Sequence, residues 1–487
     1  MVRQLLKDPG LLAEQAYVEG CWIDADSSKR IPVVDPATGE EIASVPALGA
    51  DETRRAIRAA EAAFGAWRSK PFAERAEALE RWFALMLDNI EDLAVIMTAE
   101  QGKPLAEAQG EIRYGAAFVK WFAEEARRVY GDTIPAPSRD RRIIVLKQPV
   151  GVCAAITPWN FPNAMITRKC APALAAGCTV LVKPSDLTPL SALALAVLAT
   201  RAGIPAGVFN VLTGMPEEIG AELTASPVVR KLSFTGSTRI GKLLMRQCSD
   251  TVKRVSFELG GNAPFIVFND ADLDLAVAGV MASKFRNAGQ TCVCANRILV
   301  QDGIYQEFSD RLRAEVAQLK VGNGFTPGVT IGPLINKQAV DKVTRHVHDA
   351  LAKGAKALTG GAEGGSDLFV RPTVLAGANT EMTLAHEETF GPVAPLFRFG
   401  EEDEAIEIAN ATPYGLAAYY FTRELNRSWR VAEKLDFGMV GLNTGSVSME
   451  VAPFGGVKQS GIGREGSRYG LEEYLEVKAF HIGGLVM

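Results

Sequence analysis

The chain has 487 residues, of which 47% are hydrophobic, so it can bury more than one core, and its length predicts roughly two to four domains. Its 52 basic and 57 acidic residues give a net charge of −5, which excludes a basic footprint for nucleic acid or an anionic membrane. No apolar run approaches the about 20 residues of a membrane span, and residues 1–8 lack the apolar core of a signal peptide, so we expect a cytoplasmic protein with a small-molecule ligand.

The first half of the chain predicts a helical layer followed by an α/β unit. Residues 50–129 are charged and repeat their apolar positions with a helical period. A proline-rich run at 131–137 ends this layer, and 142–148 then has the pattern of a strand. From 151 to 258 short apolar strands alternate with helical stretches, as in a parallel sheet wrapped by helices. These strands are expected at 151–156, 179–183, 207–211 and 231–234.

The second half repeats the alternation. New strands are expected at 265–268 and 297–300, and they predict a second α/β domain that ends near Gly438. The chain finishes with an apolar strand at 477–482. The predicted fold class is therefore α/β, with two doubly wound parallel-sheet domains.

Two segments of this second region carry reactive side chains. Residues 285–294, Phe-Arg-Asn-Ala-Gly-Gln-Thr-Cys-Val-Cys, set Cys292 in a small polar turn near Arg286. A thiol at an exposed turn that favours the thiolate can attack a carbonyl carbon, although a cysteine taken alone is more often a small buried hydrophobe. Upstream, Glu258 ends a β-rich run and faces a Gly-Gly turn. The region therefore holds a candidate nucleophile and a candidate base.

These segments resemble the signatures of the aldehyde dehydrogenase superfamily, which read E-L-G-G around the glutamate and F-x-N-x-G-Q-x-C around the cysteine. The resemblance runs almost end to end, through residues 35–39, 157–162, 387–392 and 453–461. It implies the aldehyde dehydrogenase fold in three parts: a dinucleotide-binding domain at 1–130 and 150–258, a catalytic domain at 259–438, and a small β oligomerisation flap at 131–149 and 465–487. In the family such a flap pairs with another subunit, so the resemblance implies a homodimer or homotetramer.

Two glycine-rich motifs do not fit their usual ligands. Residues 461–466 read G-x-G-x-x-G, but only about 20 residues follow, too few for the βαβ unit that this fingerprint needs. Residues 236–242 fit a Walker loop until Leu243 replaces the Ser or Thr that would hold magnesium, so ATP hydrolysis is disfavoured. Residues 234–237 remain, at a strand end before a helix, where a pyrophosphate can bind without a metal, although such glycines are often structural.

The resemblance implies a full cofactor site. Lys183 would bond the adenosine ribose, and Glu388 with Phe390 would hold the nicotinamide ribose. The residues it assigns to the cofactor are Ile156, Thr157, Pro158, Trp159, Lys183, Ser185, Asp186, Gly214, Gly220, Phe234, Gly236, Ser237, Leu259, Glu388 and Phe390. Asp186 can accept from both ribose hydroxyls and would repel a 2′-phosphate, which favours NAD, whereas Lys183 and Ser185 suit a phosphate equally well and keep NADP open.

The resemblance also implies a mechanism. An aldehyde carbon must become tetrahedral before it gives up a hydride, so oxidation needs a thiolate, a hydride acceptor and a base for hydrolysis of the thioester. Cys292, NAD(P) and Glu258 take these roles, and the Asn160 amide with the Cys292 backbone N–H would stabilise the oxyanion. A turn-capping role is the alternative for Asn160. Lys169 and Glu465 match positions that relay protons in relatives.

Two arginines suggest a substrate with a carboxylate. By the family's layout Arg168 and Arg286 lie near the substrate entrance, and guanidinium groups suit bidentate carboxylate recognition, although each arginine is equally consistent with an ion pair. The pair resembles the succinate-semialdehyde dehydrogenase branch, which serves GABA degradation and in which a serine matching Ser448 also binds the carboxylate. Met449 departs from that branch, so glutarate semialdehyde, one methylene longer, is the close alternative.

Other interpretations stay open. A broader aldehyde dehydrogenase is one, and a cofactor-independent cysteine esterase is another, although an esterase would leave Lys183 and Glu388 without a role. Cys294, two residues after Cys292, suggests either a strained, reducible disulfide that switches the enzyme off or a thiol that packs below the nucleophile.

The remaining cysteines and the histidines predict no metal site. The cysteines lie at 21, 153, 170, 178, 248, 292 and 294, and this scattered, odd set indicates a reducing compartment. None is spaced for zinc, and His346 with His348, the only close histidine pair, is expected on a solvated helix face.

Overall fold

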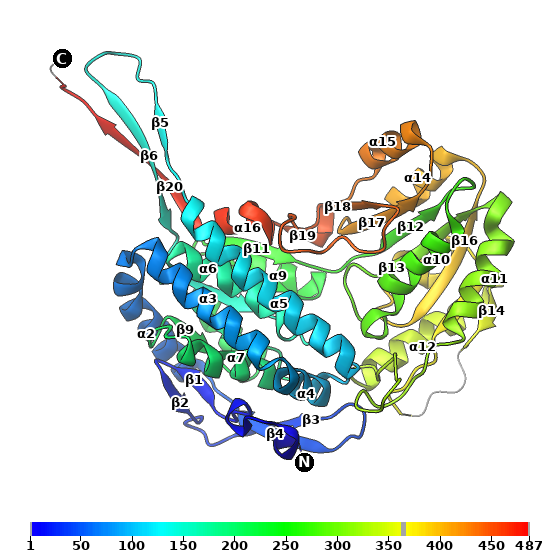
Figure 1. Ribbon diagram of the computed structural model, residues 1–487, viewed down its shortest axis with the longest axis horizontal. Coiled ribbons are helices and arrows are strands. Elements are labelled where there is room, and N and C mark those ends of the chain that lie inside the picture. Colours follow the sequence, from blue (N-terminus) through cyan, green and yellow to red (C-terminus); the bar gives the residue numbers. More distant parts are fainter. Residues whose placement is uncertain (1, 362–366, 486–487) are drawn as a thin grey trace.

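The computed structural model describes residues 2–361 and 367–485. Two α/β bodies lie side by side, and a long β arm projects from the first of them (Figure 1). Around the first body lie the short helix α1 (Val2–Leu5) and a separate hairpin of β3 (Arg30–Val34) and β4 (Glu41–Pro46). In this described part of the chain, none of the helices combines the length and the apolar composition that a bilayer crossing needs.

The first body contains an eight-stranded sheet in the order β19-β11-β10-β7-β8-β9-β1-β2. Its five central strands are parallel, and short antiparallel strands close both edges. The strands are β1 (Ala16–Val18), β2 (Cys21–Ile23), β7 (Val152–Ile156), β8 (Thr179–Lys183), β9 (Phe209–Val211), β10 (Val229–Thr235), β11 (Arg254–Glu258) and β19 (Gly461–Ile462). All four strands predicted between 151 and 258 are confirmed. Every residue of β8 is buried, as expected for a sheet covered on both faces.

Helices cover both faces of this sheet. One face carries α3 (Phe72–Asp88), α4 (Ile90–Gln101), α5 (Leu105–Glu125), α6 (Ala164–Ala176) and α7 (Leu190–Arg201). The other carries α2 (Ala50–Ser69), α8 (Pro216–Ala225) and α9 (Thr238–Ser249). The predicted helical segment at 50–129 is confirmed, but it is not a single layer, because the apolar side chains of α2 pack mainly on the opposite face from α3 to α5.

The second body contains a seven-stranded sheet in the order β14-β15-β16-β13-β12-β17-β18, parallel except for β14. Its strands are β12 (Ala263–Val267), β13 (Ala295–Gln301), β14 (Lys356–Thr359), β15 (Thr373–Ala378), β16 (Val393–Phe399), β17 (Ala417–Phe421) and β18 (Met439–Leu442). Its helices are α10 (Leu273–Val280), α11 (Tyr305–Val316), α12 (Lys337–Ala352), α13 (Thr383–His386), α14 (Glu402–Asn410) and α15 (Leu425–Lys434). The predicted strands at 265–268 and 297–300 are confirmed, and β18 extends the sheet past Gly438, where we expected the unit to end.

The arm is a three-stranded antiparallel sheet of β5 (Asp132–Ile134), β6 (Arg142–Pro149) and β20 (Leu475–Ile482), preceded by α16 (Ser467–Glu472). β20 pairs with β6 along its whole length, from Leu475 opposite Pro149 to Ile482 opposite Arg142. It stands away from both bodies (Figure 1). The predicted fold class, with two parallel-sheet units and a small β flap, is confirmed.

Candidate active site

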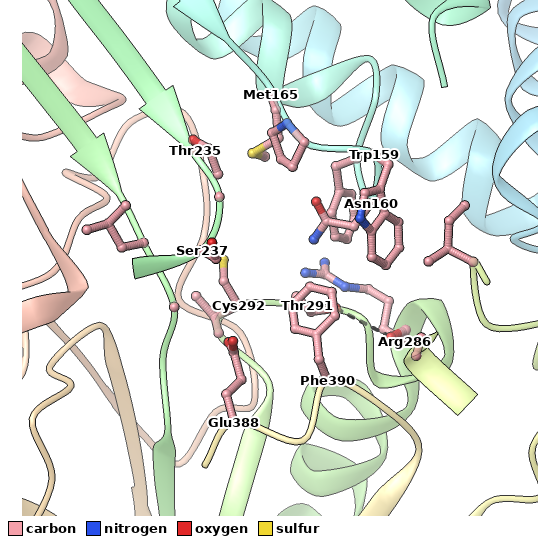
Figure 2. A pocket seen from close by; sticks show the side chains of 18 of the residues that line it. Trp159, Asn160, Met165, Thr235, Ser237, Arg286, Thr291, Cys292, Glu388 and Phe390 are labelled. Carbon is pink, nitrogen blue, oxygen red and sulfur yellow. Dashed lines mark hydrogen bonds between the residues drawn. The ribbon is translucent and has the colours of Figure 1, made fainter. Parts of the chain in front are cut away.

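A cavity of about 440 Å³ lies between the two bodies, where loops from both meet (Figure 2). Twelve of the residues predicted from the sequence line it: Pro158, Trp159, Asn160, Arg168, Gly236, Ser237, Leu259, Arg286, Cys292, Glu388, Phe390 and Ser448. A second cavity of about 450 Å³ shares Arg286, Val293 and Ser448 with the first. These three residues therefore stand at the junction between the two cavities.

Cys292 follows a turn with an unusual backbone conformation. Asn287 and Ala288 have φ values of 52° and 55°, in the left-handed region that non-glycine residues seldom adopt. The Glu107 carboxylate accepts a hydrogen bond from the Asn287 backbone N–H at 2.9 Å and helps to hold this turn. Cys292 is half-buried, and Figure 2 shows it facing the same cavity as Asn160.

The expectation that this turn favours the thiolate is wrong. Burial raises the pKa of the Cys292 thiol to about 12, and the nearby Glu388 and Glu258 carboxylates act in the same direction. The positive charges of Arg168 and Arg286 lower the pKa but do not outweigh these effects. The thiol is therefore protonated at neutral pH in this state, and its proton must be removed before it can attack a carbonyl carbon.

Glu258 lies at the end of β11, paired in register with Thr235 at the end of β10. Its side chain is buried, and its Oε2 atom has no hydrogen-bond partner among the described residues. Burial raises the pKa of Glu258 well above its usual value, and the nearby Glu465 carboxylate adds to the shift. Thr235 and Leu259 line the cavity directly beside it. A buried carboxyl with a raised pKa suits a group that takes up a proton.

Lys169, Glu465 and Thr235 form a continuous polar chain next to this carboxyl. The Lys169 ammonium makes a short ion pair with Glu465 and donates to the Thr235 hydroxyl at 2.6 Å. Arg168 pairs with the other oxygen of Glu465 at 2.7 Å. Burial acts to raise the pKa of Glu465, but the charges of Lys169 and Arg168 outweigh it and hold the pKa below its usual value. The two residues predicted to relay protons thus lie in direct contact.

The two arginines differ in their surroundings. Arg168 is only 2% exposed, lies 3.9 Å from the centre of the Phe454 ring and is paired with Glu465. Arg168 therefore lines the cavity, but its charge is already matched by Glu465 inside the protein. Arg286 is exposed, lies over the Phe161 ring at 5.2 Å and makes no ion pair within the described part of the chain. Its guanidinium is free to bind an anion.

A tyrosine connects Arg168 to Ser448. The Tyr114 hydroxyl forms a short hydrogen bond with the Ser448 hydroxyl and accepts one from Arg168 at 3.4 Å. Met449, the residue expected to reshape the pocket, is 45% exposed and lies outside the linings of both cavities. The expected effect of Met449 on the pocket is therefore not supported by its position.

Asn160 is tied to the loop that carries Cys292. Its side-chain amide donates to the Gln290 carbonyl at 3.0 Å, and its own carbonyl accepts from the Asn287 amide at 3.0 Å. Figure 2 shows its side chain projecting into the cavity on the side opposite Cys292 and Glu388. The amide is thus a donor within the cavity that holds the candidate nucleophile.

The carboxyl edge of the first sheet supplies the rest of the predicted cofactor site. Lys183, at the end of β8, is buried, and no described residue accepts a hydrogen bond from its ammonium. Burial lowers the pKa of Lys183 to about 8, although the nearby Asp186 carboxylate opposes the shift. Next to it, the backbone N–H of Thr157 donates to the Lys183 carbonyl at 3.1 Å, and Ile156 pairs with Lys183 in register. A ribose hydroxyl or a phosphate here would give Lys183 the acceptor that it lacks.

The predicted glycines near the carboxyl edge of the first sheet differ in what the absence of a side chain allows. A side-chain carbon added at Gly220 would have no neighbour within 4 Å, which leaves room for a ligand. At Gly214 the φ is +147° and the Leu48 carbonyl would lie 2.5 Å from such a carbon, so contacts within the protein already require glycine there. Gly236 and Ser237 directly precede α9, and the N-terminus of a helix suits a diphosphate.

Glu388 accepts a hydrogen bond from the Gly261 backbone N–H at 3.0 Å, and burial raises the pKa of its carboxyl to about 7. Phe390 packs edge-on against Trp159, with 5.7 Å between the ring centres. These residues line the same cavity as Ser237, which directly precedes α9 (Figure 2). The donors, acceptors and open space along this edge fit a dinucleotide.

Residues 22–480 match the model of the aldehyde dehydrogenase family. The chain belongs to this family. It is therefore an oxidoreductase. The hydrogen-bond donors and acceptors at the carboxyl edge of the first sheet suit a nicotinamide dinucleotide as its cofactor.

Similar proteins of this family differ in their substrates. The chain is 62% identical over 483 residues to a 3-sulfolactaldehyde dehydrogenase of Pseudomonas putida, covering 99% of each chain. It is 60% identical over 483 residues to a glutarate-semialdehyde dehydrogenase of Pseudomonas aeruginosa, covering 99% of this chain and 100% of the relative. It is 59% identical over 480 residues to the NADP(+) succinate-semialdehyde dehydrogenase of Escherichia coli, covering 98% and 99%.

Some predicted residues of this aldehyde dehydrogenase lie outside the cavity. Ile156, Thr157, Lys183, Ser185, Asp186, Gly214, Gly220 and Phe234 follow the edge of the first sheet, and Glu258, Lys169 and Glu465 lie behind the cavity wall. Cys294 is buried, and its thiol donates to the Lys284 and Ala295 carbonyls at 3.6 and 3.7 Å. In this state it is a packed thiol and not part of a disulfide. A disulfide with Cys292 would require the Cys294 thiol to leave these two carbonyls.

The sequence did not point to several lining residues. These are Tyr114, Phe161, Met165, Thr235, Thr291, Val293, Ile335, Asn336, Gln338, Ala339, Lys342, Thr389 and Phe454. Tyr114 comes from a helix whose pattern is that of an ordinary amphipathic helix, so only the packing of α5 on α6 brings it to the cavity. Thr235 and Thr389 lie within the motifs at 234–237 and 387–392, and their small polar side chains were the available signal.

His346 corrects a further expectation. It lies on α12 but is buried rather than solvated, with Nε2 3.1 Å from the Glu387 carboxylate and Nδ1 3.2 Å from the Thr389 hydroxyl. Burial lowers its pKa, so the ring is neutral at pH 7. Across residues 2–361 and 367–485 there is no cluster of three or more His, Cys, Asp or Glu side chains able to hold a metal ion.

Proposed function

We propose that this aldehyde dehydrogenase oxidises succinate semialdehyde to succinate with NAD(P). The observation that carries the proposal is the unpaired guanidinium of Arg286 next to Ser448, at the junction of the two cavities and on the wall that also bears Cys292. An anion bound there gains charge-assisted hydrogen bonds that a neutral aldehyde lacks. Tyr114 extends this polar wall from Ser448 to Arg168.

Glutarate semialdehyde is the second candidate, and 3-sulfolactaldehyde shares the same chemistry. Relatives at 60% and 62% identity carry these names, and each substrate places an anionic group beyond its aldehyde. One methylene changes the binding free energy by only about 1 kcal/mol, so succinate and glutarate semialdehydes differ less from each other than from a neutral aldehyde.

In the proposed mechanism Cys292 attacks the aldehyde carbon, and the carbonyl electron pair moves onto oxygen. The Asn160 amide and the Cys292 backbone N–H donate to this oxyanion. Since the pKa of the Cys292 thiol is about 12, the thiol must lose its proton before it attacks, and we propose that this proton passes to water in the cavity, so that Glu258 keeps its role for the hydrolysis step. A bound NAD(P) would supply the hydride acceptor, and the tetrahedral adduct on Cys292 would become a thioester when it loses its hydride.

Glu258 then takes a proton from the water that attacks this thioester, and Cys292 leaves as the thiolate. We propose that the proton collected by Glu258 is passed on to the buried polar chain of Thr235, Lys169 and Glu465. Lys169 and Glu465 serve this transfer and do not touch the substrate.

For the cofactor we propose that Lys183 and Asp186 hold the adenosine ribose, that the start of α9 at Gly236 and Ser237 holds the diphosphate, and that Glu388 holds the nicotinamide ribose. The Asp186 carboxylate disfavours a 2′-phosphate, so we propose a preference for NAD. Ser185 beside it is the residue that a 2′-phosphate would use. Because the name of the Escherichia coli relative specifies NADP(+), both nucleotides enter the test below.

We infer that the two bodies and the arm have different roles. The first body binds the cofactor, the second carries the nucleophile, and the arm pairs with another subunit in a homodimer or homotetramer. The arm exposes apolar side chains that a partner would cover: Ile134, Leu146, Val477 and Phe480.

The proposal is tested by comparing kcat/KM for succinate semialdehyde, glutarate semialdehyde, 3-sulfolactaldehyde and a neutral aldehyde of equal length, each with NAD and with NADP. We expect the anionic aldehydes to exceed the neutral one, with succinate semialdehyde first and NAD preferred. Equal values for the neutral and anionic aldehydes would contradict an anion site. Ester cleavage that proceeds without a nucleotide, with no aldehyde oxidation, would favour a cysteine esterase.

A further inference from the structure

We propose that Lys103 is a positioning residue that fixes the oxyanion donor Asn160 against the loop carrying Cys292. The proposal rests on the role proposed above for Asn160. Lys103 lies just before α5 and is 2% exposed. Its ammonium donates to the Asn160 carbonyl at 2.8 Å and to the Glu111 carboxylate at 2.5 Å, and it lies 4.1 Å from the centre of the Phe161 ring.

A buried ammonium is costly unless its protons have acceptors, and here each neighbour belongs to the site or to its support. The side chains of Lys103 and Glu111 are each only 1% exposed, so water does not compete for their charges. The remaining contacts are both on the 160–161 segment, through a backbone carbonyl and an aromatic face. Lys103 therefore links this segment to α5 by a charged, desolvated contact.

Glu111 holds the other end of the same segment. Its second carboxylate oxygen accepts from the backbone N–H groups of Asn163 and Ala164, at 2.9 and 3.2 Å. These are the first groups of α6, whose own N-cap side chain makes no capping hydrogen bond. The Lys103–Glu111 pair thus makes hydrogen bonds to both ends of the segment 160–164. The Glu111 carboxylate is also favourably placed at the N-terminus of α6.

The same helix also supports the cysteine loop. Glu107, one turn before Glu111, accepts from the Asn287 backbone N–H at 2.9 Å. The Asn287 side chain then donates to the same Asn160 carbonyl that Lys103 holds, and the Asn160 amide donates to Gln290. The geometry joins oxyanion donor and nucleophile through one rigid helix, and an error of about 1 Å in such a site can cost about 100-fold in rate.

The test starts with Lys103→Met, which keeps the length of the side chain and removes its charge. Because this leaves Glu111 buried and unpaired, a second variant, Lys103→Met with Glu111→Gln, restores neutrality and keeps an acceptor for α6. We expect both to lose about 10-fold to 100-fold in kcat with succinate semialdehyde while the Kd for NAD(P) stays within about twofold. Lys120→Met, an exposed lysine on α5, is the matched control and should keep wild-type kcat.

A double-mutant cycle with Asn160→Ala separates positioning from general damage. If Lys103 acts through Asn160, adding Lys103→Met to Asn160→Ala should lower kcat by less than about threefold. A loss that multiplies fully in the Asn160→Ala background, or a folded neutral double variant with wild-type kcat, would overturn the proposal. An inactive wild type, or an Asn160→Ala variant with full kcat, would instead refute the proposed function of the site and its oxyanion donor.

Discussion

Replacing Arg286 with glutamine should lower activity on anionic aldehydes and leave neutral ones nearly unchanged. Arg286 makes no ion pair with any described residue, so its removal breaks no charge pair inside the protein. A hydrogen bond to a charged group is worth about 1.5–3 kcal/mol, and because Arg286 is exposed we take the lower end. About 1.5 kcal/mol corresponds to about tenfold in kcat/KM, and the loss should fall mainly on KM.

Arg168→Gln is the informative comparison, because Arg168 is paired with Glu465 at 2.7 Å and is nearly fully buried. Its loss leaves Glu465 to Lys169 alone and disturbs the residues behind Cys292, so both substrate types should lose activity and the Tm should fall. Arg313→Gln, an exposed arginine on α11, is the control.

The assay is steady-state NAD(P)H formation with succinate semialdehyde and with butanal, which has the same number of carbon atoms. Equal losses on both substrates in Arg286→Gln, or no loss on either, would refute the assignment of Arg286 to the distal carboxylate.

Three further predictions concern the cofactor and the two thiols. Asp186→Ser should raise KM for NAD and lower KM for NADP; an unchanged ratio of the two would remove Asp186 from cofactor choice. Burial raises the pKa of the Cys292 thiol to about 12, so its thiolate fraction should rise about tenfold per pH unit between about pH 7 and 10. The rate of alkylation of Cys292 by iodoacetamide should rise in the same proportion, with Cys292→Ala as the blank. A plateau of this rate above about pH 8 would contradict this pKa. Cys294→Ala should keep most turnover. If Cys294 protects the nucleophile by forming a disulfide, mild peroxide should inactivate this variant irreversibly, whereas dithiothreitol should restore the activity of the wild type. Equal recovery of the two proteins would argue against a disulfide switch.

The features that the sequence predicted well are local. The strands at 179–183 and 231–234 are short apolar runs, and they lie where predicted because both faces of the sheet are covered. Cys292 and Glu258 lie in long, specific motifs, and the structure puts Cys292 on the cavity and Glu258 just behind its wall. For these strands and motifs, the residues next to one another in the sequence are enough to predict the local structure and the position of the side chain.

The features that were wrong or missing depend on contacts between distant segments. Cys292 was expected to be activated by its turn, but burial raises the pKa of its thiol, and the Glu388 and Glu258 carboxylates from other segments add to this shift. His346 has the pattern of a surface residue along its helix, yet Thr389 and Glu387 cover it. Tyr114 and Lys103 carry no local signal for the site, since the site residues that they contact, Arg168, Ser448 and Asn160, lie between 54 and 334 residues away in the chain.

The most direct test of the central claim, that Cys292 carries the substrate as a thioester, uses Glu258→Gln. This variant lacks the base for hydrolysis, so mixing it with succinate semialdehyde and NAD should give a single burst of NADH and then no turnover. Acid quenching followed by mass spectrometry of the digested protein should find one succinyl group on the peptide that contains Cys292, and none in the Glu258→Gln, Cys292→Ala double variant. A burst without an acyl group on that peptide, or an acyl group on another residue, would contradict the account.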